Sequence, residues 1–158
     1  MEYRFVTVWY VKAPIADVCA VIYQSMTWPQ WWPNVESVEE LLPSDADGLG
    51  GVRRYTWKGR LPYRFTFDIR VVNFIPMRVI EGRAKGDLEG VGCWLFSAEG
   101  ETTIVRYEWQ IRITSVWMNL LARLARPLII WNHNAVMQQG GEALALRVNA
   151  STVRVIHL

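Results

Sequence analysis

Alternation of apolar and polar positions dominates the middle of the chain and predicts a series of β-strands. The clearest case is Tyr63 to Val71, where an apolar residue stands at every second position. Similar patterns predict strands over residues 3–12, 35–42, 52–58, 77–85, 88–98 and 103–113. Short turns such as Gly86–Asp87 separate the later strands and are typical of antiparallel neighbours.

Helical spacing appears near both ends of the chain. Apolar residues after Pro14 predict a short amphipathic helix that ends near Gln24. A long helix is predicted over residues 116–148, with a kink at Pro127. Before the kink one face holds Trp117, Leu120, Leu121 and Leu124. After the kink another face holds Ile129, His133, Val136, Met137, Gly140 and Leu144.

A tryptophan-rich segment, residues 27–33, lies between the short helix and the next strand. Its two prolines exclude a long helix and predict a single turn or bent loop. Three alternative roles remain open for the indoles of Trp28, Trp31 and Trp32. They pack against the sheet or helix, they form a gate over a cavity, or they make an exposed patch for a membrane or a carrier protein.

These elements predict one α+β domain over residues 1–150. A strand and a short helix come first, about six antiparallel strands follow, and a long helix ends the domain. Residues 151–158 form a C-terminal tail with a short β-like run at 152–156 and no evident partner.

Three segments resemble the START-like superfamily, which has the helix-grip fold and includes polyketide cyclase/dehydrase and lipid-transport-like proteins. They are residues 11–18, the tryptophan-rich run at 28–35, and the pair of late strands containing 92–94 and 102–107. The resemblance implies a curved antiparallel sheet of about seven strands wrapped around the C-terminal helix. It also implies an apolar cavity between sheet and helix that holds a hydrophobic molecule.

Composition and charge narrow the class of partner. The 158 residues carry a net charge of only +2, and no dense basic cluster indicates nucleic-acid binding. The chain shows no secretory leader and no uninterrupted apolar run long enough to span a membrane, so we expect no stable membrane insertion. Cys19 and Cys93 are expected to be reduced thiols in a cytoplasmic protein. A homodimer is left open.

Aromatic residues make up 13% of the chain and are expected to line the cavity. The predicted ligand-binding residues are His133, Tyr107, Trp109, Phe65, Phe67, Trp94, Trp57 and Met137. His133 is either a core histidine with a hydrogen-bond partner or a cavity residue that orients or protonates a ligand. Gly90 and Gly92 serve either sheet curvature or ligand space. Arg54 and Arg83 are either solvated or anchors for an acidic group at the cavity mouth.

Three functions remain open on this sequence. The first is binding of a lipid, quinone, sterol or polyketide-like molecule in the internal cavity. The second is a cyclase or dehydratase that uses His133 as acid/base, helped by Tyr107. The third is an interaction module that docks through the tryptophan loop or the long helix. No metal site, cofactor fingerprint or nucleophile elbow is present, so we expect no metal and no cofactor, and catalytic residues stay unassigned.

Overall fold

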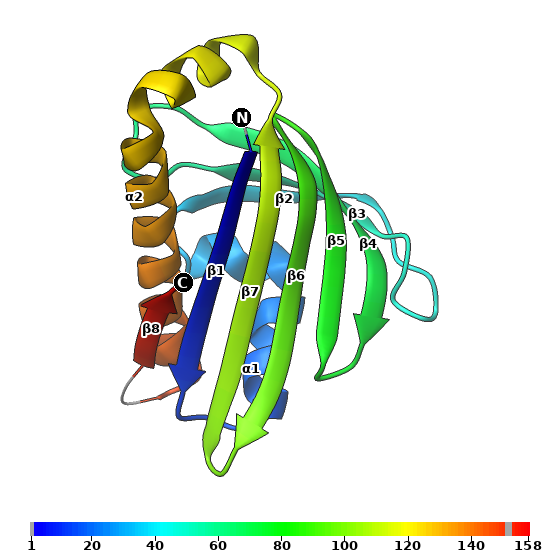
Figure 1. Cartoon of the computed structure of the whole chain (residues 1–158). Coiled ribbons are helices and arrows are strands. Elements are labelled where there is room, and N and C mark those ends of the chain that lie inside the picture. The colour runs from blue at the N-terminus through cyan, green and yellow to red at the C-terminus, as the bar shows by residue number, and fades with distance from the viewer. Residues whose placement is uncertain (1, 151–152) are drawn as a thin grey trace.

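One antiparallel sheet curves around a long helix in the computed structural model, which describes residues 2–150 and 153–158 (Figure 1). The strand order across the sheet is β2-β3-β4-β5-β6-β7-β1-β8. The elements are β1 (Glu2–Val11), α1 (Ile15–Tyr23), the 3₁₀ helix η1 (Ser25–Gln30), β2 (Val35–Leu42), β3 (Val52–Trp57), β4 (Phe65–Ile75), β5 (Val79–Gly86), β6 (Leu88–Glu99), β7 (Thr102–Ile113), α2 (Val116–Arg147) and β8 (Val153–His157). This is the predicted α+β helix-grip architecture.

The C-terminal tail differs from its prediction because it has a partner. Strand β8 pairs antiparallel with β1, with Val11 opposite Val153 and Thr7 opposite His157. It satisfies the edge of β1 that β7 leaves open, and so adds an eighth strand to the seven expected. Thr152, the first residue of the predicted run, lies outside the described residues.

Two buried indoles fix α2 to the concave face of the sheet. Trp9 Nε1 donates a hydrogen bond to the Met137 carbonyl at 3.1 Å, and Trp32 Nε1 donates to the Val136 carbonyl at 3.1 Å. Gly140 allows this close approach, because a Cβ there would overlap the Trp32 indole. The position of α2 above the sheet is therefore set by tryptophans from β1 and from the turn after η1.

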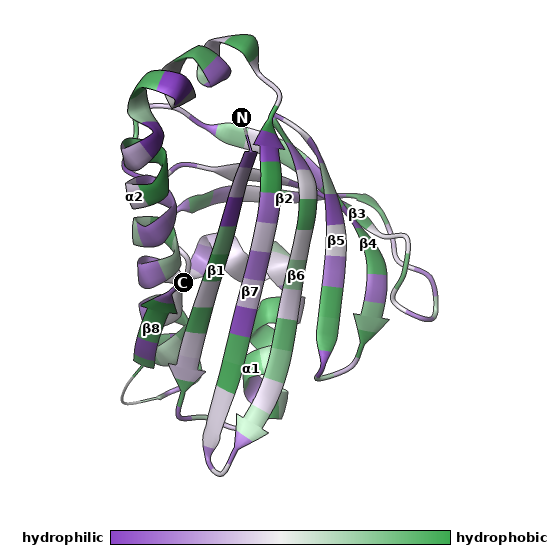
Figure 2. Cartoon of the chain, in the orientation of Figure 1, coloured by the Kyte–Doolittle hydropathy of each residue, from purple (hydrophilic) through white to green (hydrophobic). Residues whose placement is uncertain are grey.

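The predicted kink divides α2 into two parts. The backbone leaves helical geometry at Ala125 (φ −128°, ψ 29°), two residues before Pro127. Beyond the kink, Ile129, Met137 and Leu144 are buried under the sheet. Before it, Trp117, Leu120 and Leu124 of the other predicted apolar face are exposed, and Figure 2 shows hydrophobic and hydrophilic positions interspersed along this part of the helix. Among the described residues, no helix is long and apolar enough to cross a membrane.

Candidate functional site

A pocket lies between the concave face of the sheet and α2. The space open to the centres of water-sized molecules is about 180 Å³. Strands β3 to β7 supply one wall, and η1 and α2 supply the other. All eight residues predicted to bind a ligand line this pocket: Phe65, Phe67, Trp57, Trp94, Tyr107, Trp109, His133 and Met137. Their contact with a ligand remains a prediction.

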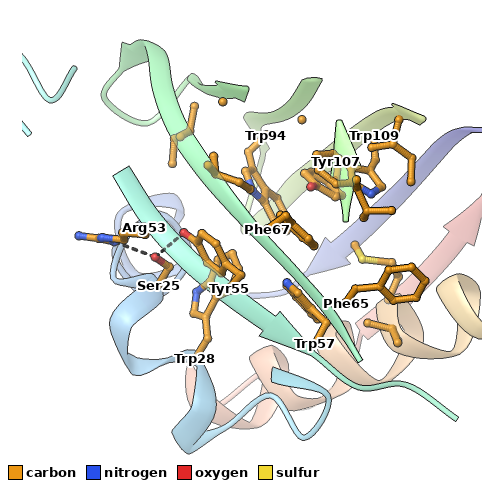
Figure 3. A pocket seen from close by; sticks show the side chains of 18 of the residues that line it. Ser25, Trp28, Arg53, Tyr55, Trp57, Phe65, Phe67, Trp94, Tyr107 and Trp109 are labelled. Atoms are coloured by element: carbon orange, nitrogen blue, oxygen red, sulfur yellow. Dashed lines mark hydrogen bonds between the residues drawn. The ribbon is translucent and has the colours of Figure 1, made fainter. Parts of the chain in front are cut away.

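Aromatic rings form a continuous surface along the sheet side of the pocket. Trp94 stacks on Tyr107 with ring centroids 4.1 Å apart, and Tyr107 is 5.9 Å from Trp109. Alternation along β7 turns Tyr107 and Trp109 to the same face. Figure 3 shows these rings beside Phe67 and Trp57 around one space.

The tryptophan-rich loop extends this aromatic wall inside the molecule. Trp28 and Trp32 are buried and both line the pocket. Their ring centroids are 5.2 Å apart, and Trp28 lies 6.0 Å from Trp94. Trp31 is half-buried. Of the uses left open for this loop, packing inside the fold is the one that the structure shows, so the loop offers few indoles for docking.

A chain of three polar side chains closes one end of the pocket. Arg53 Nη1 donates a hydrogen bond to Ser25 Oγ at 2.7 Å, and Ser25 Oγ lies 2.8 Å from the Tyr55 hydroxyl (Figure 3). Burial raises the pKa of Tyr55, and its Ser25 and Arg53 neighbours only partly oppose this effect. Exposed Tyr23 and Ser44 line the same end, so the polar chain lies where the pocket meets solvent.

His133 lies partly buried in the pocket wall, with both of its ring nitrogens shielded from solvent. Its ring stacks on Phe5 with centroids 3.8 Å apart, and neither ring nitrogen has a hydrogen-bond partner among the described residues. Burial lowers the pKa of His133 to about 3, against a smaller opposing influence from Asn134. The imidazole is therefore neutral near pH 7.

Two further polar groups, from Trp57 and Tyr107, belong to residues that line the pocket. Trp57 Nε1 is buried and makes no hydrogen bond within the described part of the chain. The Tyr107 hydroxyl also makes none among the described residues, and burial raises the pKa of Tyr107, which keeps it a donor. Trp57, Tyr107 and His133 thus bring unused hydrogen-bonding atoms into an otherwise apolar space.

The two glycines of β6 have different roles. A Cβ at Gly90 would overlap the Gln110 carbonyl of the neighbouring strand, so Gly90 serves the close approach of β6 and β7. A Cβ at Gly92 would lie 2.8 Å from the Trp109 ring and 3.0 Å from the Tyr107 hydroxyl. Gly92 lines the pocket and leaves room for these rings.

Comparison with known proteins gives the family. A family model described as polyketide cyclase/dehydrase and lipid transport matches residues 3–149. The chain belongs to this family. No curated protein matches the sequence.

Solved structures agree with this polyketide cyclase/dehydrase and lipid-transport fold. The Zhui aromatase/cyclase from Streptomyces sp. R1128 has a TM-score of 0.76 at 16% identity, covering 94% of each chain. A START superfamily protein from Mycobacterium smegmatis has a TM-score of 0.74 at 14% identity, covering 93% of this chain and 98% of its own. A major latex-like protein from Panax ginseng has a TM-score of 0.61 at 10% identity, covering 89% of this chain and 96% of its own. At these identities the likeness is one of fold.

The arginine that lines the pocket is neither of the two that the sequence suggested as anchors for an acidic group. Arg54 forms a bidentate pair with Asp68, at 2.8 and 3.1 Å, away from the pocket, and Arg83 is exposed. Arg53, which stands in a basic stretch expected from the sequence to be solvated, lines the pocket instead. The signal was present in the alternation of β3, since Arg53 shares its face with Tyr55 and Trp57.

Proposed function

We propose that this domain binds a hydrophobic, ring-containing small molecule that carries at least one oxygen acceptor. The observation that supports the proposal is the set of unused hydrogen-bonding atoms in an aromatic pocket, above all Trp57 Nε1. A buried donor without a partner costs about 1–3 kcal/mol. A ligand oxygen that accepts from Trp57 would recover this cost while its rings contact the aromatic wall.

The size and polarity of the pocket favour some ligand classes over others. Its volume of about 180 Å³ is slightly larger than a dry apolar cavity of roughly 150 Å³ that binds benzene. One or two fused rings therefore fit without movement of the walls. Arg53 at the mouth attracts an acidic or carbonyl oxygen. Quinone-like and polyketide-like rings meet both requirements better than a saturated lipid or a sterol.

Quenching of tryptophan fluorescence tests the proposal with a panel of hydroxynaphthoquinones, a fatty acid and a sterol. We expect the quinones to bind most tightly. The Trp57→Phe variant keeps an aromatic ring, though a smaller one, and loses the donor, so its Kd should rise about tenfold. Trp117→Phe is the matched control, because Trp117 is 54% exposed and lies outside the pocket. Equal Kd values for the wild type and Trp57→Phe, or no binding by any member of the panel, would refute the proposal.

A cyclase or dehydratase activity is the second candidate. It is favoured by the presence of His133 and Tyr107 in the same pocket. Because His133 is neutral above a pKa of about 3, it suits the role of a general base rather than an acid. Tyr107 would then donate a hydrogen bond to a substrate carbonyl.

Mass spectrometry tests this candidate with a linear poly-β-ketone thioester, which loses the mass of water when it cyclises and dehydrates. His133→Gln should lower the rate about 100-fold or more. Tyr107→Phe should lower it less, because it removes a hydrogen bond and no proton acceptor. Release of the bound thioester unchanged by the wild type would leave a binding protein and no enzyme.

A further inference from the structure

The first part of α2 carries an apolar face that nothing in the described structure covers. Val116, Trp117, Leu120 and Leu124 are 85%, 54%, 65% and 82% exposed. We call these four residues the α2 apolar face. At about 100° per residue they lie within a single arc of about 100°. The side chain of Leu121, which the sequence places near them, lies outside the described residues.

This exposure is not a frayed helix end. Met118, on the opposite side of the same segment, is only 4% exposed. Asn119 Nδ2 donates a hydrogen bond to the Ile113 carbonyl at 2.8 Å, and the Trp117 ring lies 5.7 Å from Tyr63. The segment is therefore attached to the body of the protein while its apolar side faces outward. An exposed cluster of this kind on a folded domain is typical of an interaction site.

The charges carried by this stretch of α2 itself are positive. Residues 116–141 contain two arginines, Arg123 and Arg126, and no acidic residue. The Arg126 guanidinium lies 4.6 Å from the Tyr3 ring centroid, and beyond the kink Arg60 lies 5.5 Å from the Trp131 ring centroid. Leucine and tryptophan next to arginine is the pattern of a helix that lies in the headgroup region of an anionic bilayer.

The shape of this surface also favours a bilayer over a protein partner. The four residues belong to the first part of the kinked helix α2, which lies at one end of the molecule (Figure 1). None of them lines either of the two pockets described for the protein. A specific protein interface buries about 800 Å² on each partner, whereas a bilayer needs only a few inserted side chains.

We propose that the α2 apolar face docks on the surface of an anionic lipid bilayer. Trp117, Leu120 and Leu124 enter the boundary between headgroups and acyl chains, and Arg123 contacts lipid phosphate. The contact is peripheral, consistent with the finding that no described helix can span a membrane. It extends beyond ligand binding in the pocket and does not depend on it.

Vesicle flotation with the ligand-free protein tests this proposal. Vesicles of phosphatidylcholine alone are compared with vesicles containing about 30% phosphatidylglycerol. The wild type should float with the anionic vesicles, and added salt should weaken the binding because lipid charge contributes to it. Leu124→Glu should lower the bound fraction about tenfold, since a carboxylate opposes both insertion and the lipid charge.

Leu146→Glu is the matched control, because Leu146 is 78% exposed at the far end of the same helix. It makes the same chemical change and should leave vesicle binding intact, and thermal melts verify that both variants fold. Equal losses for the two variants, or no binding of the wild type to anionic vesicles, would overturn the proposal. Without vesicle binding, a dimer that only Leu124→Glu dissociates would instead assign this face to a second copy of the chain.

Discussion

His133 shows how the surroundings of one residue set its chemistry. The main cause of its lowered pKa is removal from water against the Phe5 ring. A neutral imidazole in such a place can accept or donate one hydrogen bond without carrying charge into the pocket. The same burial makes the residue sensitive to acid, since protonation requires a charge in an apolar wall.

Stability should therefore fall in mild acid because of His133. The unfolded chain titrates near the ordinary pKa of 6.5 and the folded chain near 3, so between these values the unfolded state binds more protons. The free energy of unfolding should decrease with falling pH by up to about 1.4 kcal/mol per pH unit from this group. Urea denaturation between about pH 5 and pH 7 measures the slope.

His133→Leu should remove most of that slope, because leucine has no proton to bind. His157→Gln is the control, since His157 is only partly buried and its pKa is lowered by the same cause. It should keep the larger part of the slope. An unchanged slope in His133→Leu would show that another group controls the acid sensitivity.

At the scale of elements, α2 is held against the sheet by its contacts with Trp9 and Trp32. Gly140 sits against Trp32, which also donates to the Val136 carbonyl. An alanine in a helix normally stabilises it by about 0.8–1.0 kcal/mol relative to glycine. At Gly140 the added methyl group would overlap the Trp32 indole, so steric strain outweighs the gain in helix stability.

Gly140→Ala should therefore destabilise the protein by about 1–3 kcal/mol, as overpacking of a core does. Trp32→Phe also destabilises, but its smaller ring leaves space for the new methyl group. The double variant should be more stable than the sum of the two losses predicts, by about 0.5 kcal/mol or more. Strictly additive losses in urea denaturation would mean that the helix moves away from Trp32 instead.

The order of the elements could be predicted because it depends on local pattern. Alternation over Tyr63 to Val71 and the kink at Pro127 are properties of neighbouring residues; the structure has a strand over Phe65–Ile75 and a helix kink just before Pro127. Strand β8 could not be predicted in the same way. Its partner β1 stands about 150 positions earlier, and five residues carry no signal of which edge they will join.

Part of the candidate site could also be predicted from local pattern, and part could not. Apolar residues at alternate positions of the strands, and at helical spacing in α2, predicted the lining of the pocket. All eight predicted residues line it. The chain formed by Arg53, Ser25 and Tyr55 was missed, because it joins η1 to β3 through contacts that only the folded chain creates. A charged residue beside another charged residue, as Arg53 is beside Arg54, suggests a solvated strand until the facing element is known.

For the molecule as a whole, sheet and helix enclose a space that folding alone does not fill. A ligand that binds only the folded state adds stability of about 2.7 kcal/mol at a concentration 100 times its Kd. For a chain of this length that corresponds to a rise in Tm of roughly 5–10 °C. A thermal melt with the tightest ligand of the panel measures it.

The Trp57→Phe variant at the same ligand concentration should show about half that rise, because a tenfold weaker Kd leaves about 1.4 kcal/mol. Trp117→Phe should show the full rise. A ligand that quenches fluorescence but leaves Tm unchanged would bind the surface or the unfolded chain. That result would contradict the proposal that the ligand binds in the pocket.

The clustered indoles also affect how the protein absorbs light. Trp32 lies 5.6 Å from Trp9, 5.2 Å from Trp28 and 4.9 Å from Trp57, at interplanar angles of 62°, 50° and 89°. Electronic transitions of tilted chromophores this close couple and give paired bands of opposite sign in circular dichroism. These bands overlap the peptide signal, so far-ultraviolet spectra of this protein will misstate its helix content unless the aromatic contribution is subtracted.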